Sequence, residues 1–279
     1  MSLISLLIAL AAERHLKSPL WQFSTYYQHY FNWLKRLSSA TLLSKNAWLL
    51  NGFILLPTIA VYLLMRLISD SFLHLILATV ILIVCFGCVK SRNIYKKFLH
   101  AAFRGELTTC DEYYHELEQQ KSITVDNIGE LLILLNYRYY IAIMLFFVLF
   151  GPAGAVFYRL LVTVVEQRGD AELTLAEPVV SSCRNLLQII DWLPVRLTTF
   201  GYMFVGHFSK AFSTWLEILF DFHQPANSVL TGIAKKAEDF MVDPDDCTAE
   251  PCLLVRLAKR NVLLFLAIIS VFTITGIIH

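Results

Sequence analysis

Long apolar runs alternate with polar segments along this chain of 279 residues. Such runs are typical of membrane helices, because an α-helix needs roughly 20 mostly apolar residues to cross the hydrocarbon core of a bilayer. Strands of a membrane barrel are excluded, since they would alternate apolar and polar residues over about 10 positions. The pattern predicts an all-α, polytopic membrane protein with four transmembrane helices, at residues 47–65, 72–89, 139–158 and 261–278.

Two further apolar stretches leave alternatives open. Residues 197–220 carry only the charges Lys210 and Glu217, which permits either a fifth span broken near Ser209 or two shorter helices packed on the others. Membrane contact is the favoured interpretation. Residues 1–12 are apolar but short, and no basic residue precedes them as it would in a secretory signal. We therefore expect a retained, partly inserted N-terminal helix.

The distribution of charges predicts the orientation, because short cytoplasmic loops accumulate Lys and Arg. The charged residues of the segment 90–104 are all basic: Lys90, Arg92, Lys96, Lys97 and Arg104. We expect residues 90–138 to form a cytoplasmic loop. Acids outnumber arginines in residues 166–192, so residues 166–196 are expected as a periplasmic loop. Residues 238–258 are interpreted as an acidic linker.

Composition supports the membrane assignment and narrows the partners. The chain is 57% hydrophobic and only 16% charged, and its mean hydropathy is +0.58. Such a composition is too apolar for an ordinary soluble domain, so we expect a single integral membrane domain over residues 1–279, with membrane lipid as a partner. Lys and Arg number 23 against 22 Asp and Glu. This balance leaves no basic field for a nucleic-acid backbone, so no nucleic-acid partner is expected.

Two polar segments are predicted to be helices. Aromatic and leucine side chains recur at helical spacing in residues 21–37, which indicates an interfacial aromatic helix within the region 13–46. Thr109 and Glu112 have the spacing of a capping box, and an acidic helix is expected to follow them. This acidic helix is either a solvated connector or a surface for a protein partner, and the sequence leaves both open.

The cysteines do not indicate a metal or redox site. Cys85 and Cys88 form a CxxC run near the end of an apolar span, where thiolates are disfavoured and two further zinc ligands are lacking. Cys247 and Cys252 could pair only if their linker faces an oxidising compartment. Asp221 and His223 are two residues apart, so they would not share a helix face as metal ligands. We expect no metal, no cofactor and no catalytic residue.

Charges at the predicted membrane edges are the strongest indication of function, because an unpaired charge in hydrocarbon costs at least ~2.5 kcal/mol. These charged side chains either assemble a polar pocket, or pair with one another and extend to the membrane–water interface. Both alternatives stay open. The charges are Glu13 with Arg14, Arg138, Arg159, and Asp191 with Arg196.

One motif and its companions carry a family resemblance. Residues 191–197 read D-W-L-P-V-R-L, and the other matching positions are Glu13-Arg14, Asn136-Tyr137-Arg138-Tyr139, Gly206-His207, Trp215 and Asp221-Phe222-His223. With these positions the chain resembles the AmpE family of inner-membrane proteins linked to β-lactamase induction. Pro194 is suited to the first turn of a helix, so Asp191 is expected to precede that helix and to meet Arg196 inside it.

The resemblance implies a multi-pass protein of the bacterial inner membrane that regulates β-lactamase induction and cell-wall recycling. It implies a binding site rather than a catalytic one, taking an anionic small molecule or a peptidoglycan-derived ligand. A protein partner is also compatible with this interpretation. The candidate ligand-binding residues are Asp191, Arg196, Arg138, His207, Asp221, Glu13 and Arg14.

An enzyme is the alternative. The family is similar to the cobalamin-biosynthesis membrane synthases, which carry a related motif and a carboxylate-and-amide run before one span. Leu134, Leu135 and Arg138 stand at those places in this chain. Because ATP chemistry needs acids to hold Mg²⁺, their loss favours a non-enzymatic regulator over a membrane enzyme acting on a lipid- or cofactor-linked substrate.

Overall fold

The computed structural model is helical wherever regular structure occurs. It describes residues 2–13, 15–16, 18–37, 47–121, 123, 125–166, 177–221, 224–238 and 248–276. These ranges contain no β-strand, so the all-α prediction is confirmed. The chain divides into two compact units. The first comprises Met1–Val89, Ala142–Leu187 and Ile269–His279, and the second comprises Lys90–Ile141 and Gln188–Ile268.

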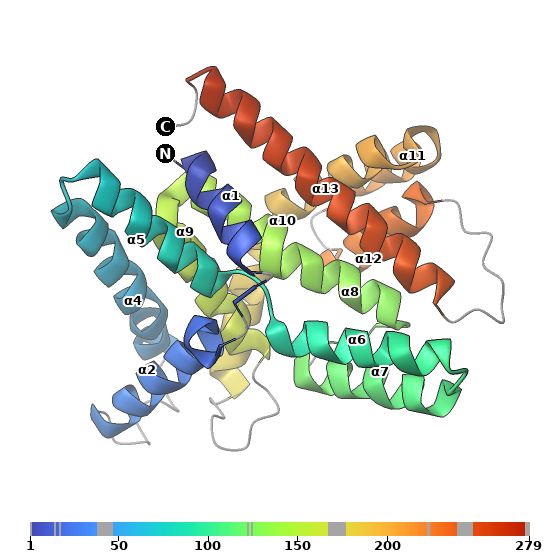
Figure 1. Cartoon of the computed structure of the whole chain (residues 1–279), viewed down its shortest axis with the longest axis horizontal. Helices are drawn as coiled ribbons and strands as arrows, with labels where there is room; N and C mark the ends of the chain where they lie inside the picture. Colours follow the sequence, from blue (N-terminus) through green and yellow to red (C-terminus); the bar gives the residue numbers. More distant parts are fainter. Residues whose placement is uncertain are drawn as a thin grey trace. The chain divides into compact units, whose positions relative to one another are not determined.

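The first unit is organised around helix α9, Ala142–Glu166, against which α1, α4 and α5 pack. Helix α1 also runs alongside α5 (Figure 1), where Leu6 and Ala9 of α1 and Leu82 of α5 are fully buried. Burial of these apolar side chains holds the helices together. The elements before α9 are α1 (Ser2–Glu13), a 3-10 turn η1 (Pro19–Trp21), α2 (Phe23–Leu37), α4 (Ala47–Leu67) and α5 (Ser71–Cys85).

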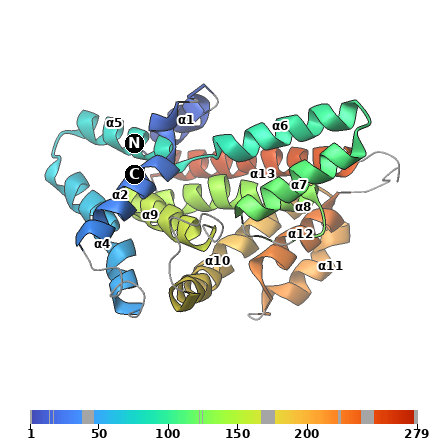
Figure 2. The same cartoon turned by 90° about the horizontal axis from the view of Figure 1, so that it is seen from below.

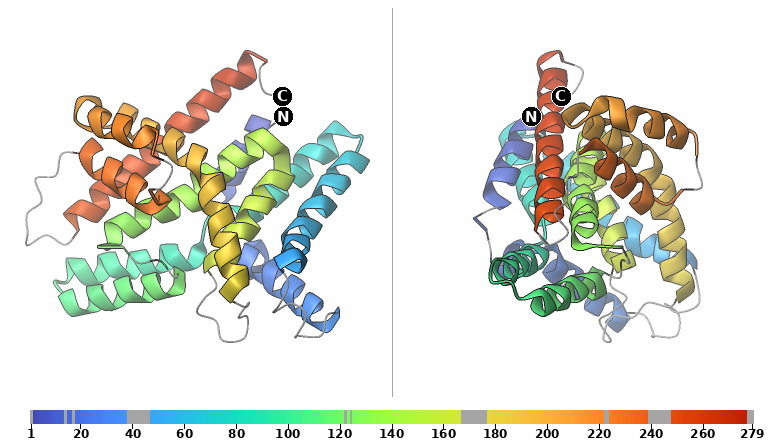
Figure 3. Two further views of the ribbon diagram at one scale, coloured as in Figure 1. Left: turned by 180° about the vertical axis from the view of Figure 1, so that it is seen from behind. Right: turned by 90° about the vertical axis from the view of Figure 1, so that its right-hand side faces the viewer.

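Helix α9 bends sharply at Gly151 (Figure 3). Gly151 has φ +68° and ψ −161°, a conformation that glycine adopts without the steric strain of a side chain. Pro152 follows and cannot donate a backbone hydrogen bond to the preceding turn. The predicted span 139–158 is therefore two helical pieces joined at this bend, and the apolar helix leading into it begins further upstream.

The second unit contains a helical hairpin and a group of helices around the segment that leads into α9. The hairpin has a buried core of Phe98, Ala101 and Cys110, which packs with Ile128. Helices α11 and α12 lie side by side (Figure 2), and α12 also packs on α8. Its elements are α6 (Val89–Phe103), α7 (Leu107–Lys121), α8 (Ile128–Asn136), the π-helical turn η2 (Tyr137–Ile141), α11 (Phe208–Leu219), α12 (Ala226–Ala237), and most of α10 (Glu177–Val205) and α13 (Ala249–Ile274).

The described residues provide two or three candidate membrane spans, where the sequence predicted four. Ile128–Glu166 and α13 are each long and apolar enough to cross a bilayer. A third span results if α5 and α6, which meet at a bend, act together. The remaining apolar helices are shorter, at Leu3–Glu13 and Leu55–Leu67. These candidate spans support a helical membrane protein, and the predicted N-terminal and aromatic helices are present as α1 and α2.

Several predicted connections are helical. Residues 90–138 form α6, α7 and α8 rather than an open loop, and α7 begins at Leu107, so Thr109 lies inside the helix instead of capping it. The acidic helix itself is confirmed as α7. Helix α10 already begins at Glu177, within the expected periplasmic loop. On which side of the membrane these segments lie stays a prediction.

The uncertain region near residue 209 resolves into two helices. Residues 197–220 comprise the end of α10 and α11, separated at Gly206 and His207. Residues 239–247 lie outside the described ranges, and α13 begins at Ala249, so the expected linker 238–258 is helical over its last ten residues.

Candidate functional site

A buried hydrogen bond joins two positions that the sequence placed in different motifs. The hydroxyl of Tyr137 donates to Oδ1 of Asp191 at 2.7 Å. Tyr137 is 0% exposed and Asp191 is 2% exposed, so this carboxylate is held away from solvent. A hydrogen bond to a buried carboxylate is stronger than one between neutral groups. The pair ties α10 to the π-helical turn η2.

Tyr137 lies where helix α8 passes into the π-helical turn η2. The backbone N–H of Tyr137 is shared between the carbonyls of Ile133 and Leu134, and η2 then interrupts the α-helical register until Ile141. A π-turn adds a residue to a helix and changes the direction of the side chains beyond it; such turns are frequent at functional sites. Tyr137, Arg138 and Tyr139 are all buried on this single turn.

Helix α10 carries Asp191 in its interior. The prediction that Pro194 starts a helix is wrong, because α10 begins at Glu177. Proline lacks the N–H of an ordinary helical residue. After it, the hydroxyl of Thr198 donates to the carbonyl of Pro194 at 2.7 Å, and that of Thr199 donates to the carbonyl of Val195 at 2.9 Å.

Arg196 binds the end of α11. Its Nη2 donates to the carbonyls of Ile218, at 3.3 Å, and of Asp221. A cation at a helix C-terminus interacts favourably with the helix dipole. Arg196 and Asp191 are five residues apart on one helix, which places their side chains about 140° apart around its axis. The structure therefore brings Arg196 to Asp221, and Asp191 to Tyr137.

Trp215 and Trp192 complete the join between α10 and α11. The indole Nε1 of Trp215 donates to the carbonyl of Arg196 at 3.4 Å, and the guanidinium of Arg196 lies 5.1 Å from the centroid of the Trp192 ring. These contacts give Arg196 a role in holding α11 against α10. Within residues 191–197, Asp191 thus contacts η2 and Arg196 binds the end of α11.

Charged side chains are buried on and beside η2. Arg138 and Lys121 are both buried, and Lys121 contacts the hydroxyl of Tyr139 with its Nζ 4.5 Å from the centre of that ring. Asp191 is a buried carboxylate bonded to the same turn. Burying a charge is unfavourable unless a partner compensates it. The π-helical turn therefore lies in a buried region that contains charges of both signs.

The remaining predicted residues lie elsewhere. Glu13 is buried in the first unit, where its carboxyl group occupies the space that a side chain on Gly87 would fill. Arg159 donates to the carbonyl of Gly87 at 3.5 Å, so Glu13 shares its surroundings with Arg159. Arg14 lies outside the described residues. His207 is exposed before α11, and its backbone N–H donates to Ala237 at 2.7 Å.

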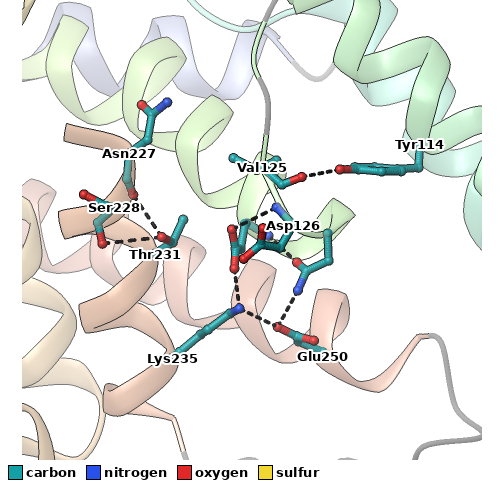
Figure 4. Close-up of polar contacts among 10 residues, drawn as sticks. Tyr114, Val125, Asp126, Asn227, Ser228, Thr231, Lys235 and Glu250 are labelled. Carbon is teal, nitrogen blue, oxygen red and sulfur yellow. Dashed lines mark hydrogen bonds and ion pairs between the residues drawn. The ribbon is translucent and has the colours of Figure 1, made fainter. Parts of the chain in front are cut away.

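Sequence reasoning missed a second polar cluster, at the junction of α8, α12 and α13 (Figure 4). Lys235 of α12 pairs with Glu130 and lies 3.8 Å from Oε1 of Glu250. Asn127 donates to Glu250 at 3.0 Å and accepts the N–H of Glu130 at 2.9 Å as the cap of α8. The N-cap spacing of Asn127 and Glu130 was the available sequence signal.

The pKa of Lys235 reflects this cluster. Partial burial acts to lower its pKa, but the hydrogen bond and negative charge of Glu130, with the charge of Glu250, raise it above its usual value. The charged form of Lys235 is therefore the stabilised one. This cluster fixes the start of α8, the helix that leads into η2.

The described residues contain no group of three His, Cys, Asp or Glu side chains that could hold a metal ion. Within the same ranges Cys85, Cys88, Cys110, Cys183 and Cys252 are not part of a disulfide bond, and Cys247 lies outside these ranges. Cys110 is a small buried side chain in the core of the hairpin.

Comparison with known proteins shows to which family the chain belongs. Residues 1–279 match the family model described as regulatory signalling modulator protein AmpE. This chain belongs to the AmpE family. It is 26% identical over 302 aligned positions to Protein AmpE of Shigella flexneri, an alignment that covers 99% of each chain. No solved structure matches the chain. The family resemblance drawn from residues 191–197 is thus confirmed, and AmpE membership supports a regulatory role in signalling.

Proposed function

We propose that this member of the AmpE family is a multi-pass protein of the bacterial inner membrane that modulates β-lactamase induction by binding an anionic ligand at η2. A peptidoglycan-derived fragment is a suitable ligand, because such fragments carry carboxylates. The burial of an arginine, Arg138, on a π-helical turn that also contacts Lys121 and Asp191 is the observation that carries the proposal.

Arg138 is the residue best suited to recognise the ligand. Its planar guanidinium can bind a carboxylate or phosphate through two parallel hydrogen bonds, which a lysine cannot reproduce. Tyr137 and Asp191 support the turn on which Arg138 lies, through their 2.7 Å hydrogen bond. Asp191 therefore acts as a positioning residue and Arg138 as the anion-binding residue.

The proposed topology keeps residues 47–65, 72–89, 139–158 and 261–278 in the membrane, with the third segment bent at Gly151. Helix α10 then leads the chain back to the side of η2, because Asp191 contacts Tyr137 and Lys235 contacts Glu130. The basic helix α6 suggests that the α6–α7 hairpin lies in the cytoplasm. An acidic helix exposed there, α7, offers a surface to a protein partner. The segment before α10 would then be periplasmic.

Complementation tests the proposal. A host with an inducible β-lactamase, lacking its own copy of this protein, would express the wild type, Arg138→Gln, Asp191→Asn or Arg256→Gln. Arg256 is an exposed arginine of α13 and serves as the matched control. We expect the first two substitutions to change β-lactamase activity after exposure to a β-lactam, and the control to leave it unchanged.

Membrane abundance, measured by immunoblotting of the membrane fraction, separates function from folding. Arg138→Gln and Asp191→Asn should reach at least half of the wild-type abundance while induction is altered. Wild-type induction in both variants at normal abundance would reject a role for η2 in regulation. Altered induction only in proportion to lost abundance would instead give these residues a structural role.

A further inference from the structure

The α6–α7 hairpin carries opposite charges on its two exposed sides. The exposed basic side chains of α6 lie on one face, within about 120° of the helix circumference, and α6 contains no acid. They are Lys90, Lys96, Lys97, His100 and Arg104, the last just beyond the helix end. The exposed charges of α7 are acidic, at Asp111, Glu112 and Glu116. We refer to the first set as the basic face of α6.

The tip of the hairpin is apolar. Phe103 is 79% exposed at the end of α6, and Leu107 is 60% exposed at the start of α7. Gly105 turns the chain between them with φ +74°. Arg104 and Glu106 approach to 4.0 Å at the tip, an exposed ion pair that contributes little. Large apolar side chains beside a row of cations are typical of helices that lie at a membrane surface.

We propose that the basic face of α6, with Phe103 at its end, lies on the headgroups of anionic phospholipids. Helix α5 is apolar and ends at Cys85, and α6 begins at Val89. Three intervening residues span at most ~11 Å, so the start of α6 stays near the point where α5 leaves the bilayer. Lysines and arginines beside a membrane segment are attracted to anionic headgroups.

The charged and apolar side chains on the surface of α6 fit neither the acyl layer nor bulk water as well as they fit the headgroups. Within the acyl layer, Lys96 and Lys97 would be charges in hydrocarbon, which is unfavourable. Away from the membrane, Phe103 and Leu107 would remain exposed to water. An anionic headgroup layer above an apolar interior accommodates both features. The inference is independent of the ligand proposed for η2, so either can fail without the other.

The test measures lipid binding to the purified full-length chain. Phosphatidylglycerol and phosphatidylcholine of equal acyl length would be titrated into detergent micelles, with bound lipids counted by native mass spectrometry. The basic-face variant carries Lys96→Gln, Lys97→Gln and Arg104→Gln. The matched control carries Asp111→Asn, Glu112→Gln and Glu116→Gln, which removes the same number of charges of opposite sign from the same hairpin.

We expect the wild type to prefer phosphatidylglycerol, and the control to keep that preference. Each basic residue near an anionic surface increases binding by about 5-fold, so the basic-face variant should lose the preference by ~10- to 100-fold. Amide hydrogen exchange in lipid nanodiscs localises the effect. Residues 90–104 should exchange more slowly with phosphatidylglycerol present than with phosphatidylcholine alone.

Clear results would overturn the inference. An unchanged preference in the basic-face variant would do so, as would full competition by millimolar soluble glycerol phosphate, which would indicate a free-phosphate site. Co-purification of RNA that the basic-face variant abolishes, without any lipid preference, would also overturn it. If the triple variant fails to fold by circular dichroism, Lys97→Gln alone should still lower phosphatidylglycerol binding by about 5-fold, and no change there counts against the inference.

Discussion

The hydrogen bond between Tyr137 and Asp191 makes a measurable prediction about stability. Tyr137→Phe removes one oxygen and leaves the aromatic ring, so packing is retained and only the bond to Asp191 is lost. Hydrogen bonds between helices in membrane proteins average about 0.6 kcal/mol, whereas bonds to charged groups reach about 1.5–3 kcal/mol. The second range applies, because Asp191 is a carboxylate that is 2% exposed and would lose a hydrogen-bond donor.

The assay is unfolding of the purified chain in mixed micelles by increasing sodium dodecyl sulfate, followed by helical ellipticity. A loss of about 1.5–3 kcal/mol corresponds to a change of roughly 10- to 150-fold in the unfolding equilibrium constant. Tyr26 is 53% exposed, and Tyr26→Phe is the control, expected to stay within ~0.5 kcal/mol of wild type. Asp191→Asn retains an oxygen that can accept the bond, so it should lose less than Tyr137→Phe.

A double-mutant cycle isolates the interaction itself. If the bond carries the effect, Tyr137→Phe should destabilise the wild type more than it destabilises Asp191→Asn. A Tyr137→Phe protein as stable as the Tyr26→Phe control would refute the reasoning, since it would mean that the buried carboxylate does not depend on the tyrosine hydroxyl.

Other features give further predictions. Gly201→Ala should cost about 1–3 kcal/mol in the same assay, because the added methyl group would collide with the fully buried Asn261, whereas Gly232→Ala has open space around it and should be neutral or slightly stabilising. Lys235 has a raised pKa, so its stabilising contribution should be complete below pH ~10.5 and be lost as the pH rises through its folded-state value; Lys235→Gln should remove that alkaline loss from a pH series of unfolding midpoints. Asn93 is exposed on α6, and Asn93→Cys should resist a membrane-impermeant maleimide in intact cells but react after lysis, with the wild type correcting for native thiols; labelling in intact cells would reverse the proposed topology. Purified protein given ATP, Mg²⁺, a corrinoid and aminopropanol phosphate should form no ligated product, and measurable turnover would favour the enzyme alternative.

Helices whose aromatic or apolar residues follow a regular pattern could be predicted from the sequence. The aromatic spacing of residues 21–37 corresponds to α2, and the last apolar run corresponds to the second half of α13. The break at Gly151 was not predicted, because a continuous apolar run carries no periodicity that would show where a helix bends. The part of α10 before Pro194 was not recognised either, since Glu177 and its polar neighbours suggested a loop on charge alone.

The charged residues of the candidate site were predicted from the sequence, but the contacts among them were not. Arg138 and Asp191 were selected because buried charges in a membrane protein need partners. No role was predicted for Tyr137, since only the packing of α10 brings Asp191 to its hydroxyl. Lys235 and Glu130 are distant in sequence, and only the packing of α12 on α8 brings them together. Tertiary packing, and not the local pattern, decides such pairs.

Helix α8 connects the polar cluster at Lys235 to η2 with no intervening loop. It begins at the residue after Asn127, which caps it beside Glu250, and it leads without interruption to Tyr137 and Arg138. Nine residues of helix make a rigid rod of about 13 Å. If α12 and α13 rotate the first turn of α8, the helix therefore displaces Arg138 at its other end. Helix α8 thus couples the two places mechanically. A movement of α12 and α13 would act on its first turn, and an anion at η2 would act on its last.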